Sequence, residues 1–249
     1  MMSTQPLGGK SALVTGGARR VGRGIALALA QAGADVVLTY RNSHAEAVET
    51  ACEIERLGRR ALAVECDVRS EASVRAAVAA AISRFGRLDL LVNNAAIFES
   101  APLDSLTLED WDAVFETNAR GPFLVAREAL PYLRDVEGRI VNIGSLGGMK
   151  AWAGHAHYCA SKAALHMLTQ AMAKAFAPEV SVNCVAPGWI ELEEKENLRA
   201  TGKAEHFAAK TPMQRNGSVE DVAQAVLFFA AGPHFVTGQV LAVDGGLGL

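Results

Sequence analysis

The sequence predicts an α/β protein in which a doubly wound parallel sheet is covered by helices. Short apolar runs alternate with longer alanine-rich segments along the 249 residues, which is typical of consecutive β-α-β units. The runs are continuous rather than alternating, as in Leu90-Leu91-Val92, and this favours strands buried on both faces. The chain has no internal repeat and no linker rich in proline or glycine, so residues 1–249 are expected to form one domain.

Seven apolar runs and six helical patterns follow one another along the chain. The predicted strands span residues 11–15, 35–40, 61–66, 89–93, 139–143, 180–185 and 240–243. The predicted helices span residues 21–32, 43–57, 70–85, 108–133, 157–177 and 218–231. Residues 188–217 are charged and irregular. They follow a strand end, where ligands of such sheets bind, so a substrate lid with a short helix near 193–199 is expected there.

Composition excludes several classes of partner and location. The formal net charge of -3 gives no strong attraction to nucleic acid or to an anionic membrane. Residues 1–9 do not read as a signal peptide, and apolar stretches such as 223–231 are too short to span a bilayer. The four cysteines are scattered, which favours reduced thiols and a cytoplasmic location. His155 and His157 have no matching third ligand, so no metal site is expected.

A glycine-rich loop joins the first strand to the first helix. Its sequence is Thr15-Gly16-Gly17-Ala18-Arg19-Arg20-Val21-Gly22. Glycines let a backbone approach a pyrophosphate closely, and the N-terminus of the following helix stabilises the negative charge. The spacing departs from the usual Gly-x-Gly-x-x-Gly, and a turn that serves only helix packing is the alternative. The strand-loop-helix order favours a dinucleotide site.

The end of the second predicted strand distinguishes between two dinucleotides. A carboxylate there would bind the ribose 2′-hydroxyl of NAD, but this chain has Tyr40-Arg41-Asn42. Arg41 suits a 2′-phosphate, and Arg19 is a second candidate. NADP(H) is therefore the expected cofactor, the alternative being that Arg41 is an ordinary surface arginine.

Polar side chains also follow the next two strands. Asp67 can accept a hydrogen bond from the adenine amino group, or it can cap the helix that begins near Ser70. Asn93 and Asn94 can bridge strand ends and the cofactor ribose, or they can merely close a turn.

Tyr158 and Lys162 stand four residues apart in the predicted helix 157–177, so they share one helix face. The pKa of a free tyrosine is about 10, and a neighbouring ammonium is expected to lower it. Such a pair can exchange a proton with an oxygen held in front of it. The spacing alone arises often by chance, and a core tyrosine beside a surface lysine is the alternative.

Taken together, these stretches resemble the short-chain dehydrogenase/reductase family over nearly the whole chain. The matching positions are residues 15–22, Asp67, residues 93–95, Asn118, Ser145, Tyr158 with Lys162, Pro187-Gly188 and residues 243–246. The resemblance implies a Rossmann-type domain with a seven-stranded parallel sheet. It also implies that members form homodimers or homotetramers, with the apolar helix near 159–177 at the interface.

The resemblance further implies a role for each matched side chain. Tyr158 would donate the proton in a reduction, and Lys162 would lower the pKa of Tyr158 and hold the nicotinamide ribose. Ser145 would bind the substrate oxygen, and Asn118 would hold a water that links Lys162 to solvent. The expected cofactor contacts are Gly16, Arg19, Arg20, Val21, Gly22, Tyr40, Arg41, Asn42, Asp67, Val68, Asn94, Ala95, Tyr158, Lys162, Pro187, Gly188 and Ile190.

Three departures from the family pattern bear on the substrate. Arg20 replaces a glycine of the phosphate loop, Ala96 replaces the last glycine of the Asn-Asn-Ala-Gly pattern, and Leu192 replaces a threonine that usually contacts the nicotinamide amide. Arg20 and Phe98, with residues 177–180 and 235–238, resemble pteridine reductases of the family. Those enzymes carry an aspartate where this chain has Ser145.

The leading hypothesis is therefore an NADPH-dependent reductase of a small-molecule ketone or 3-oxoacyl group, similar to 3-oxoacyl thioester reductases. The alternatives are a pteridine reductase and a non-catalytic NADP-binding regulatory protein. Phe98, Trp152 and Trp189 are expected at the mouth of the site, where they suit a flat ring or an apolar chain. The acidic run over residues 191–196 opposes an anionic carrier protein.

Overall fold

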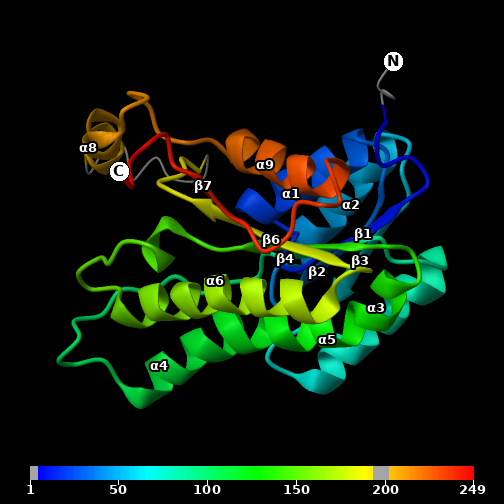
Figure 1. Ribbon diagram of the computed structural model, residues 1–249, viewed down its shortest axis with the longest axis horizontal. Coiled ribbons are helices and arrows are strands. Elements are labelled where there is room, and N and C mark those ends of the chain that lie inside the picture. The colour runs from blue at the N-terminus through cyan, green and yellow to red at the C-terminus, as the bar shows by residue number, and fades with distance from the viewer. Residues whose placement is uncertain (1–4, 193–201) are drawn as a thin grey trace.

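Seven parallel strands form one sheet through the centre of the molecule, in the order β3-β2-β1-β4-β5-β6-β7 (Figure 1). The computed structural model describes residues 5–192 and 202–249. The strands are β1 Ser11–Val14, β2 Asp35–Tyr40, β3 Ala61–Glu65, β4 Leu90–Asn93, β5 Arg139–Ile143, β6 Ser181–Pro187 and β7 Val240–Val243. The predicted fold class is confirmed. The strand order reverses between β1 and β4, and ligands of such sheets bind at that point, outside the carboxyl ends of the strands.

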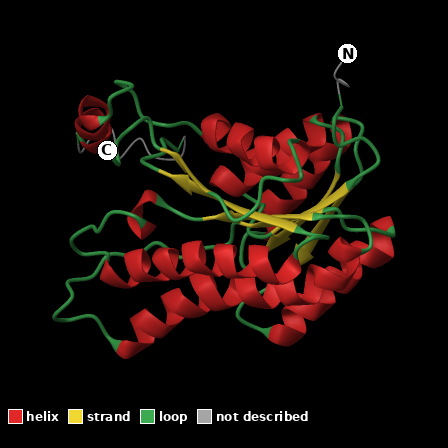
Figure 2. Ribbon diagram, in the orientation of Figure 1, coloured by secondary structure: helices red, strands yellow, loops and turns green. Residues whose placement is uncertain are grey.

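Helices cover both faces of the sheet (Figure 2). On one face lie α1 Arg20–Gln31, α2 His44–Arg56 and α9 Val219–Ala231. On the other lie α3 Glu71–Phe85, α5 Gly121–Arg134 and α6 Ala156–Phe176, with α4 Leu108–Phe115 running into α5. No helix among the described residues is long and apolar enough to cross a membrane.

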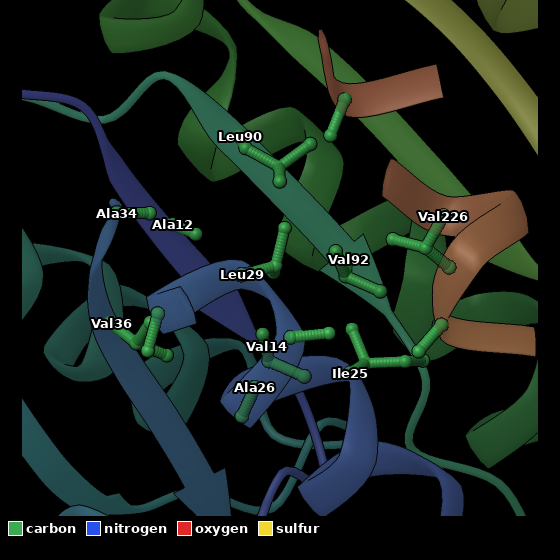
Figure 3. Close-up of a cluster of buried hydrophobic side chains, with 14 of the residues drawn as sticks. Ala12, Val14, Ile25, Ala26, Leu29, Ala34, Val36, Leu90, Val92 and Val226 are labelled. Atoms are coloured by element: carbon green, nitrogen blue, oxygen red, sulfur yellow. The ribbon is translucent and has the colours of Figure 1, made fainter. Parts of the chain in front are cut away.

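Successive strand residues point into two separate cores, which explains the continuous apolar runs. In β1, Val14 packs against α1 and α9, whereas Leu13 packs against the α3 and α5 side. In β4, Val92 belongs to the same core as Val14, and Leu91 belongs to the same core as Leu13. Figure 3 shows the first core, where Val14, Ile25, Leu29, Val92 and Val226 meet. The sheet is therefore fixed from both sides, and the strand ends that hold the site are rigid.

The predicted helix 108–133 is one helical path with an interruption. A π-helical turn, Glu116–Arg120, separates α4 from α5 and carries Asn118. Pro122 in the first turn of α5 has no N–H to donate to the carbonyl four residues earlier, which belongs to Asn118. Such turns are frequent at functional sites.

The irregular region after β6 contains a helix that the sequence did not predict, α8 Lys203–Lys210. Trp189 stacks on Phe207 of α8, with ring centroids 4.1 Å apart and planes inclined by 11°. Ile190 forms a β-bridge with Gly217, which brings the two ends of the region together. The predicted short helix near 193–199 lies outside the described residues.

Candidate active site

A cavity of about 500 Å³ opens at the carboxyl ends of the strands, where the strand order reverses. It brings together every predicted site residue except Asn118. The predicted residues that line it are Gly16, Arg19, Arg20, Val21, Gly22, Tyr40, Arg41, Asn42, Asp67, Val68, Asn94, Ala95, Ser145, Tyr158, Lys162, Pro187, Gly188 and Ile190. Residues from seven separate stretches of sequence thus share one hollow.

The glycine-rich loop lies tightly against the end of β4. A Cβ on Gly22 would stand 2.1 Å from the Gly16 carbonyl oxygen, and one on Gly16 would stand 3.0 Å from Cα of Ala95. Gly16 also has a φ of +63°, which favours glycine. Close packing therefore demands both glycines, and the same packing leaves the loop backbone open toward the cavity.

Arg20 departs from this pattern. It has a φ of +53°, in the left-handed region, at the position where the family usually has glycine. A non-glycine residue pays roughly 1–2 kcal/mol for that conformation. Its exposed side chain lines the cavity together with those of Arg19 and Arg41. Three cations therefore lie at the end of the cavity formed by the glycine-rich loop.

Asn94 joins the ends of β1 and β4. Its Nδ2 donates to the carbonyl oxygens of Thr15 and Gly16, each at 3.0 Å. Thr15 Oγ1 in turn accepts from the backbone N–H of Asn94 at 3.0 Å and of Ala95 at 3.1 Å. The predicted bridging of strand ends is confirmed; contact of Asn94 with a ribose remains a prediction.

Asp67 forms a forked ion pair at the end of β3. Its carboxylate accepts from Nη2 of Arg69 at 2.6 Å and from the Arg69 backbone N–H at 3.0 Å. These bonds hold the pKa of Asp67 below its usual range. The helix α3 is capped by Ser70, whose Oγ accepts from the Ser73 N–H at 3.3 Å, so the alternative of Asp67 as a cap is wrong.

Tyr158 and Lys162 lie one turn apart in α6, as predicted, and both are buried. Lys162 Nζ donates to the Ile143 carbonyl oxygen at 2.7 Å and lies 5.8 Å from the Tyr158 ring centroid. The Ser145 side chain lies close enough to Tyr158 to act on the pKa of the phenol, and both residues line the cavity. Phenol and hydroxyl therefore sit together at the cavity wall, where both can meet one substrate oxygen.

Burial sets the pKa values of this pair. It raises the pKa of Tyr158 to about 12, against a smaller opposing effect of Ser145, and lowers the pKa of Lys162 to about 8. The prediction that Lys162 lowers the pKa of Tyr158 is wrong for this structure. Desolvation outweighs the charge, and the ammonium is directed at the Ile143 carbonyl. Tyr158 is thus a neutral phenol at pH 7, as a proton donor must be.

Asn118 is buried beside the site rather than in its wall. Its Nδ2 donates to the Ile97 carbonyl oxygen at 2.9 Å and to Ser161 Oγ at 3.1 Å, while Oδ1 accepts from the Ile97 N–H at 2.8 Å. The side chain therefore fastens the segment after β4 to α6. Its predicted role as the holder of a water stays a prediction.

Sequence reasoning missed His166, which lies beneath the turn that carries Ser145. Its Nε2 accepts from the Ser145 N–H at 3.4 Å. A Cβ on Gly144 would stand 2.3 Å from that nitrogen, and one on Gly148 would stand 2.6 Å from Cε1. Burial, assisted by the charge of Lys162, lowers the pKa of His166 to about 4. Its position four residues after Lys162, on the same helix face, was the available signal.

The three predicted aromatics, Phe98, Trp152 and Trp189, line the cavity opposite the arginines, as expected. Leu192 lines it as well. His157, next to Tyr158, is wholly buried, and neither ring nitrogen has a hydrogen-bond partner among the described residues. In the part of the chain that the structure describes, no group of three His, Cys, Asp or Glu side chains could hold a metal ion.

The cavity lies where the strand order reverses, with the glycine-rich loop at one end and Ser145, Tyr158 and Lys162 at the other. This arrangement defines a nucleotide-dependent oxidoreductase. Comparison with known proteins agrees. A family model described as enoyl-(acyl carrier protein) reductase matches residues 16–248. A 3-oxoacyl-[acyl-carrier-protein] reductase of Synechocystis is 39% identical over 240 residues, covering 95% of this chain and 96% of that protein. One of Staphylococcus aureus is 37% identical over 241 residues, covering 96% and 98%.

Solved structures give the same result. A short-chain dehydrogenase/reductase of Serratia marcescens has a TM-score of 0.92 at 36% identity, covering 98% of this chain and 100% of that one. A metagenomic blue fluorescent protein in complex with NADPH has a TM-score of 0.89 at 39% identity, covering 98% and 99%. The chain belongs to the short-chain dehydrogenase/reductase family and is an oxidoreductase.

Proposed function

We propose that this protein is an NADPH-dependent carbonyl reductase that converts a ketone or 3-oxoacyl group into an alcohol, with Tyr158 as the proton donor. The observation that carries the proposal is the placement of Ser145 and Tyr158 together in the wall of a cavity whose lining also holds three arginines. The pair offers two neutral donors to one oxygen, and the arginines offer charge to a phosphorylated nucleotide. The relatives named as 3-oxoacyl reductases support the choice of a carbonyl.

The residues present fit NADP(H). Gly16 and Gly22 pack the loop tightly against the end of β4 and both line the cavity, and Arg41 stands just after β2 with Arg19 in the same cavity lining. Arg41 and Arg19 would pair with a 2′-phosphate, and the loop backbone would accept the pyrophosphate. When bound, the cofactor supplies the hydride. The NADPH complex of one structural relative supports this assignment.

Tyr158 and Ser145 would act on the substrate oxygen as negative charge builds on it. Both donate hydrogen bonds to that oxygen, and Tyr158 passes its proton to complete the alcohol. A phenolate is then left in a buried place, where desolvation disfavours the negative charge, so Tyr158 must regain a proton before the next turnover. Asn118 would restore the proton through a water at the π-helical turn. General acid catalysis of this kind contributes about 10²- to 10⁴-fold in rate.

The test compares acetoacetyl-CoA with crotonyl-CoA as oxidants of NADPH. A carbonyl reductase turns over the first and not the second, whereas an enoyl reductase does the opposite. Tyr158→Phe removes only the hydroxyl, so kcat should fall about 10²-fold or more while the NADPH Kd stays within about twofold. Retained turnover in Tyr158→Phe would contradict the proposed role. NADPH binding without turnover of any carbonyl would favour a non-catalytic regulatory protein.

Pteridine reduction is the second candidate, because Arg20 lines the cavity and the Phe98 ring lies against Tyr158. The hydroxyl of Ser145 in place of a carboxylate speaks against it. NADPH oxidation by dihydrobiopterin would support this candidate, and its absence would exclude it.

We also propose a cytoplasmic homodimer or homotetramer with residues 188–217 as a substrate lid. The four cysteines are free thiols, as suits a reducing compartment. Phe123 of α5 and Met167 of α6 leave apolar surface exposed on neighbouring helices, which supports an interface there. Light scattering of the purified protein measures the assembly.

A further inference from the structure

Three aromatic rings from separate segments meet at the reacting end of the cavity. Phe98 lies edge-on to Tyr158, with centroids 4.8 Å apart and planes at 80°, and edge-on to Trp152, at 6.4 Å and 88°. Trp152 and Tyr158 are nearly parallel, at 6.3 Å and 16°. Two rings thus run parallel and a third stands perpendicular to both. Phe98, Trp152 and Tyr158 together form the aromatic corner of the cavity.

The aromatic corner is braced from outside the cavity. His155 stacks on Phe98, with centroids 4.7 Å apart and planes at 16°, and His155 Nδ1 is hydrogen-bonded to the Glu99 carbonyl oxygen at 2.9 Å. The loop after β4, which carries Phe98, is joined to the loop before α6, which carries Trp152, by a backbone hydrogen bond of 2.9 Å from the Ala101 N–H to the Gly154 carbonyl oxygen. Phe98 nevertheless remains 57% exposed. Its ring is therefore held in orientation while one surface stays available.

The aromatic corner offers no charge to a substrate. The lining arginines belong to the glycine loop and the end of β2, and Lys162 is buried against the Ile143 carbonyl. Asp67, the one carboxylate among the described lining residues, is paired with Arg69. Trp189 and Leu192 extend the apolar wall. A carboxylate or phosphate on the body of the substrate would lose its hydration there without gaining a partner.

We propose that the aromatic corner selects neutral compounds whose reacting carbonyl belongs to, or is directly attached to, a planar conjugated ring. This inference rests on the proposed carbonyl reduction. A flat ring gains offset-stacked or edge-to-face contacts from rings already held in place. A flexible acyl chain gains only contact area and loses rotational freedom when it is ordered.

Two matched pairs of substrates test the inference: 1-phenyl-1,2-propanedione against 2,3-hexanedione, and ethyl benzoylacetate against ethyl acetoacetate. In NADPH oxidation, the ring member of each pair should have a kcat/KM about 10-fold or more above the chain member. Phe98→Leu and Trp152→Leu keep apolar surface but remove a ring. Each should lower the ring-to-chain ratio of kcat/KM about 3- to 10-fold, through a higher KM for the ring members.

The controls separate the possible failures. Phe235→Leu makes the same exchange at a side chain that is 99% exposed and does not line the cavity, so the ring preference should persist. Phe98→Tyr and Trp152→Phe keep an aromatic ring, so both should retain the preference for ring substrates. These two variants also test the inference if a leucine variant fails to fold. An equal or higher kcat/KM for the chain members in the parent protein, or a ring preference that keeps its full size in both leucine variants, would overturn the inference alone. No NADPH oxidation with any of the four compounds would overturn the proposed function and the inference with it.

Discussion

The two ends of the cavity are built in different ways. The nucleotide end consists of strand ends and a glycine loop locked by backbone contacts, such as the bonds from Asn94 to Thr15 and Gly16. The substrate end consists of side chains on loops, held by ring contacts between Phe98, Trp152 and His155. Backbone geometry tolerates almost no change, whereas ring contacts tolerate exchange at modest cost. The nucleotide end is therefore expected to fix the chemistry, and the substrate end to set the choice of substrate.

The largest effect is expected from Gly22→Ala. The added Cβ would stand 2.1 Å from the Gly16 carbonyl oxygen, so the loop must move away from the end of β4. We expect the NADPH Kd to rise about 100-fold or more, with an unfolding midpoint lowered as well. Gly58→Ala is the control for NADPH affinity, because an added Cβ at Gly58 has no atom within 4 Å and Gly58 does not line the cavity. Unchanged NADPH affinity in Gly22→Ala would break the view that backbone packing defines this end.

The next effect concerns His166, which supports Ser145 between the two ends. The pKa of His166 is about 4 in the folded protein and about 6.5 in the unfolded chain. Between about pH 4 and 6.5, the His166 imidazole is therefore protonated in the unfolded chain but neutral in the folded protein. Stability should therefore fall as pH drops from about 6.5 to 4, by up to ~3 kcal/mol. Denaturant unfolding at several pH values measures this slope.

A flatter slope over that range is expected for His166→Gln, whereas His234→Gln, a change in a loop histidine outside the cavity lining, should match the parent protein. Carboxylates with lowered pKa, such as that of Asp67, lose their contribution only at lower pH and do not produce this slope. Identical slopes for the parent and His166→Gln would refute the assignment.

A smaller effect is expected for Arg41→Ala. Loss of a charge-assisted contact to the 2′-phosphate should weaken NADPH binding about 10- to 100-fold. NADH lacks that phosphate, so its Kd should stay within about twofold. Arg134→Ala removes an exposed arginine at the far end of α5 and serves as the control. Equal losses for both nucleotides would mean that Arg41 does not read the 2′-phosphate.

The smallest effect is expected at the lid. Phe207→Leu removes the ring on which Trp189 stacks at 4.1 Å. KM for the carbonyl substrate should rise about threefold, with NADPH affinity unchanged. An effect on NADPH affinity instead would show that the lid region serves the nucleotide end.

Much of the fold was predictable because it depends on local pattern. Strands buried on both faces give continuous apolar runs, and the glycine loop and Tyr158-x-x-x-Lys162 are contiguous in sequence. The helix α8 escaped prediction because it is only eight residues long and polar on average. The π-helical turn at Asn118 escaped because it uses the same residue types as an α-helix.

The parts of the site that sequence did not predict depend on distant neighbours. The pKa of Tyr158 rises because tertiary packing buries the phenol, and spacing alone indicated the opposite direction. The stacking of His155 on Phe98 joins two loops far apart in the chain. The ion pair of Asp67 with Arg69 was not predicted either, although the two residues are close in sequence, and contact of Asp67 with the adenine stays a prediction.

The transfer of deuterium from NADPH in which both hydrogens at nicotinamide C4 are replaced by deuterium tests the central claim most directly. The purified protein is given the labelled cofactor and a ketone, and the product is examined by mass spectrometry. Carbonyl reduction predicts one deuterium on the carbon that bears the new hydroxyl, with the hydroxyl proton drawn from water by way of Tyr158. An alcohol without deuterium at that carbon, or deuterium on a reduced C=C bond instead, would contradict the account.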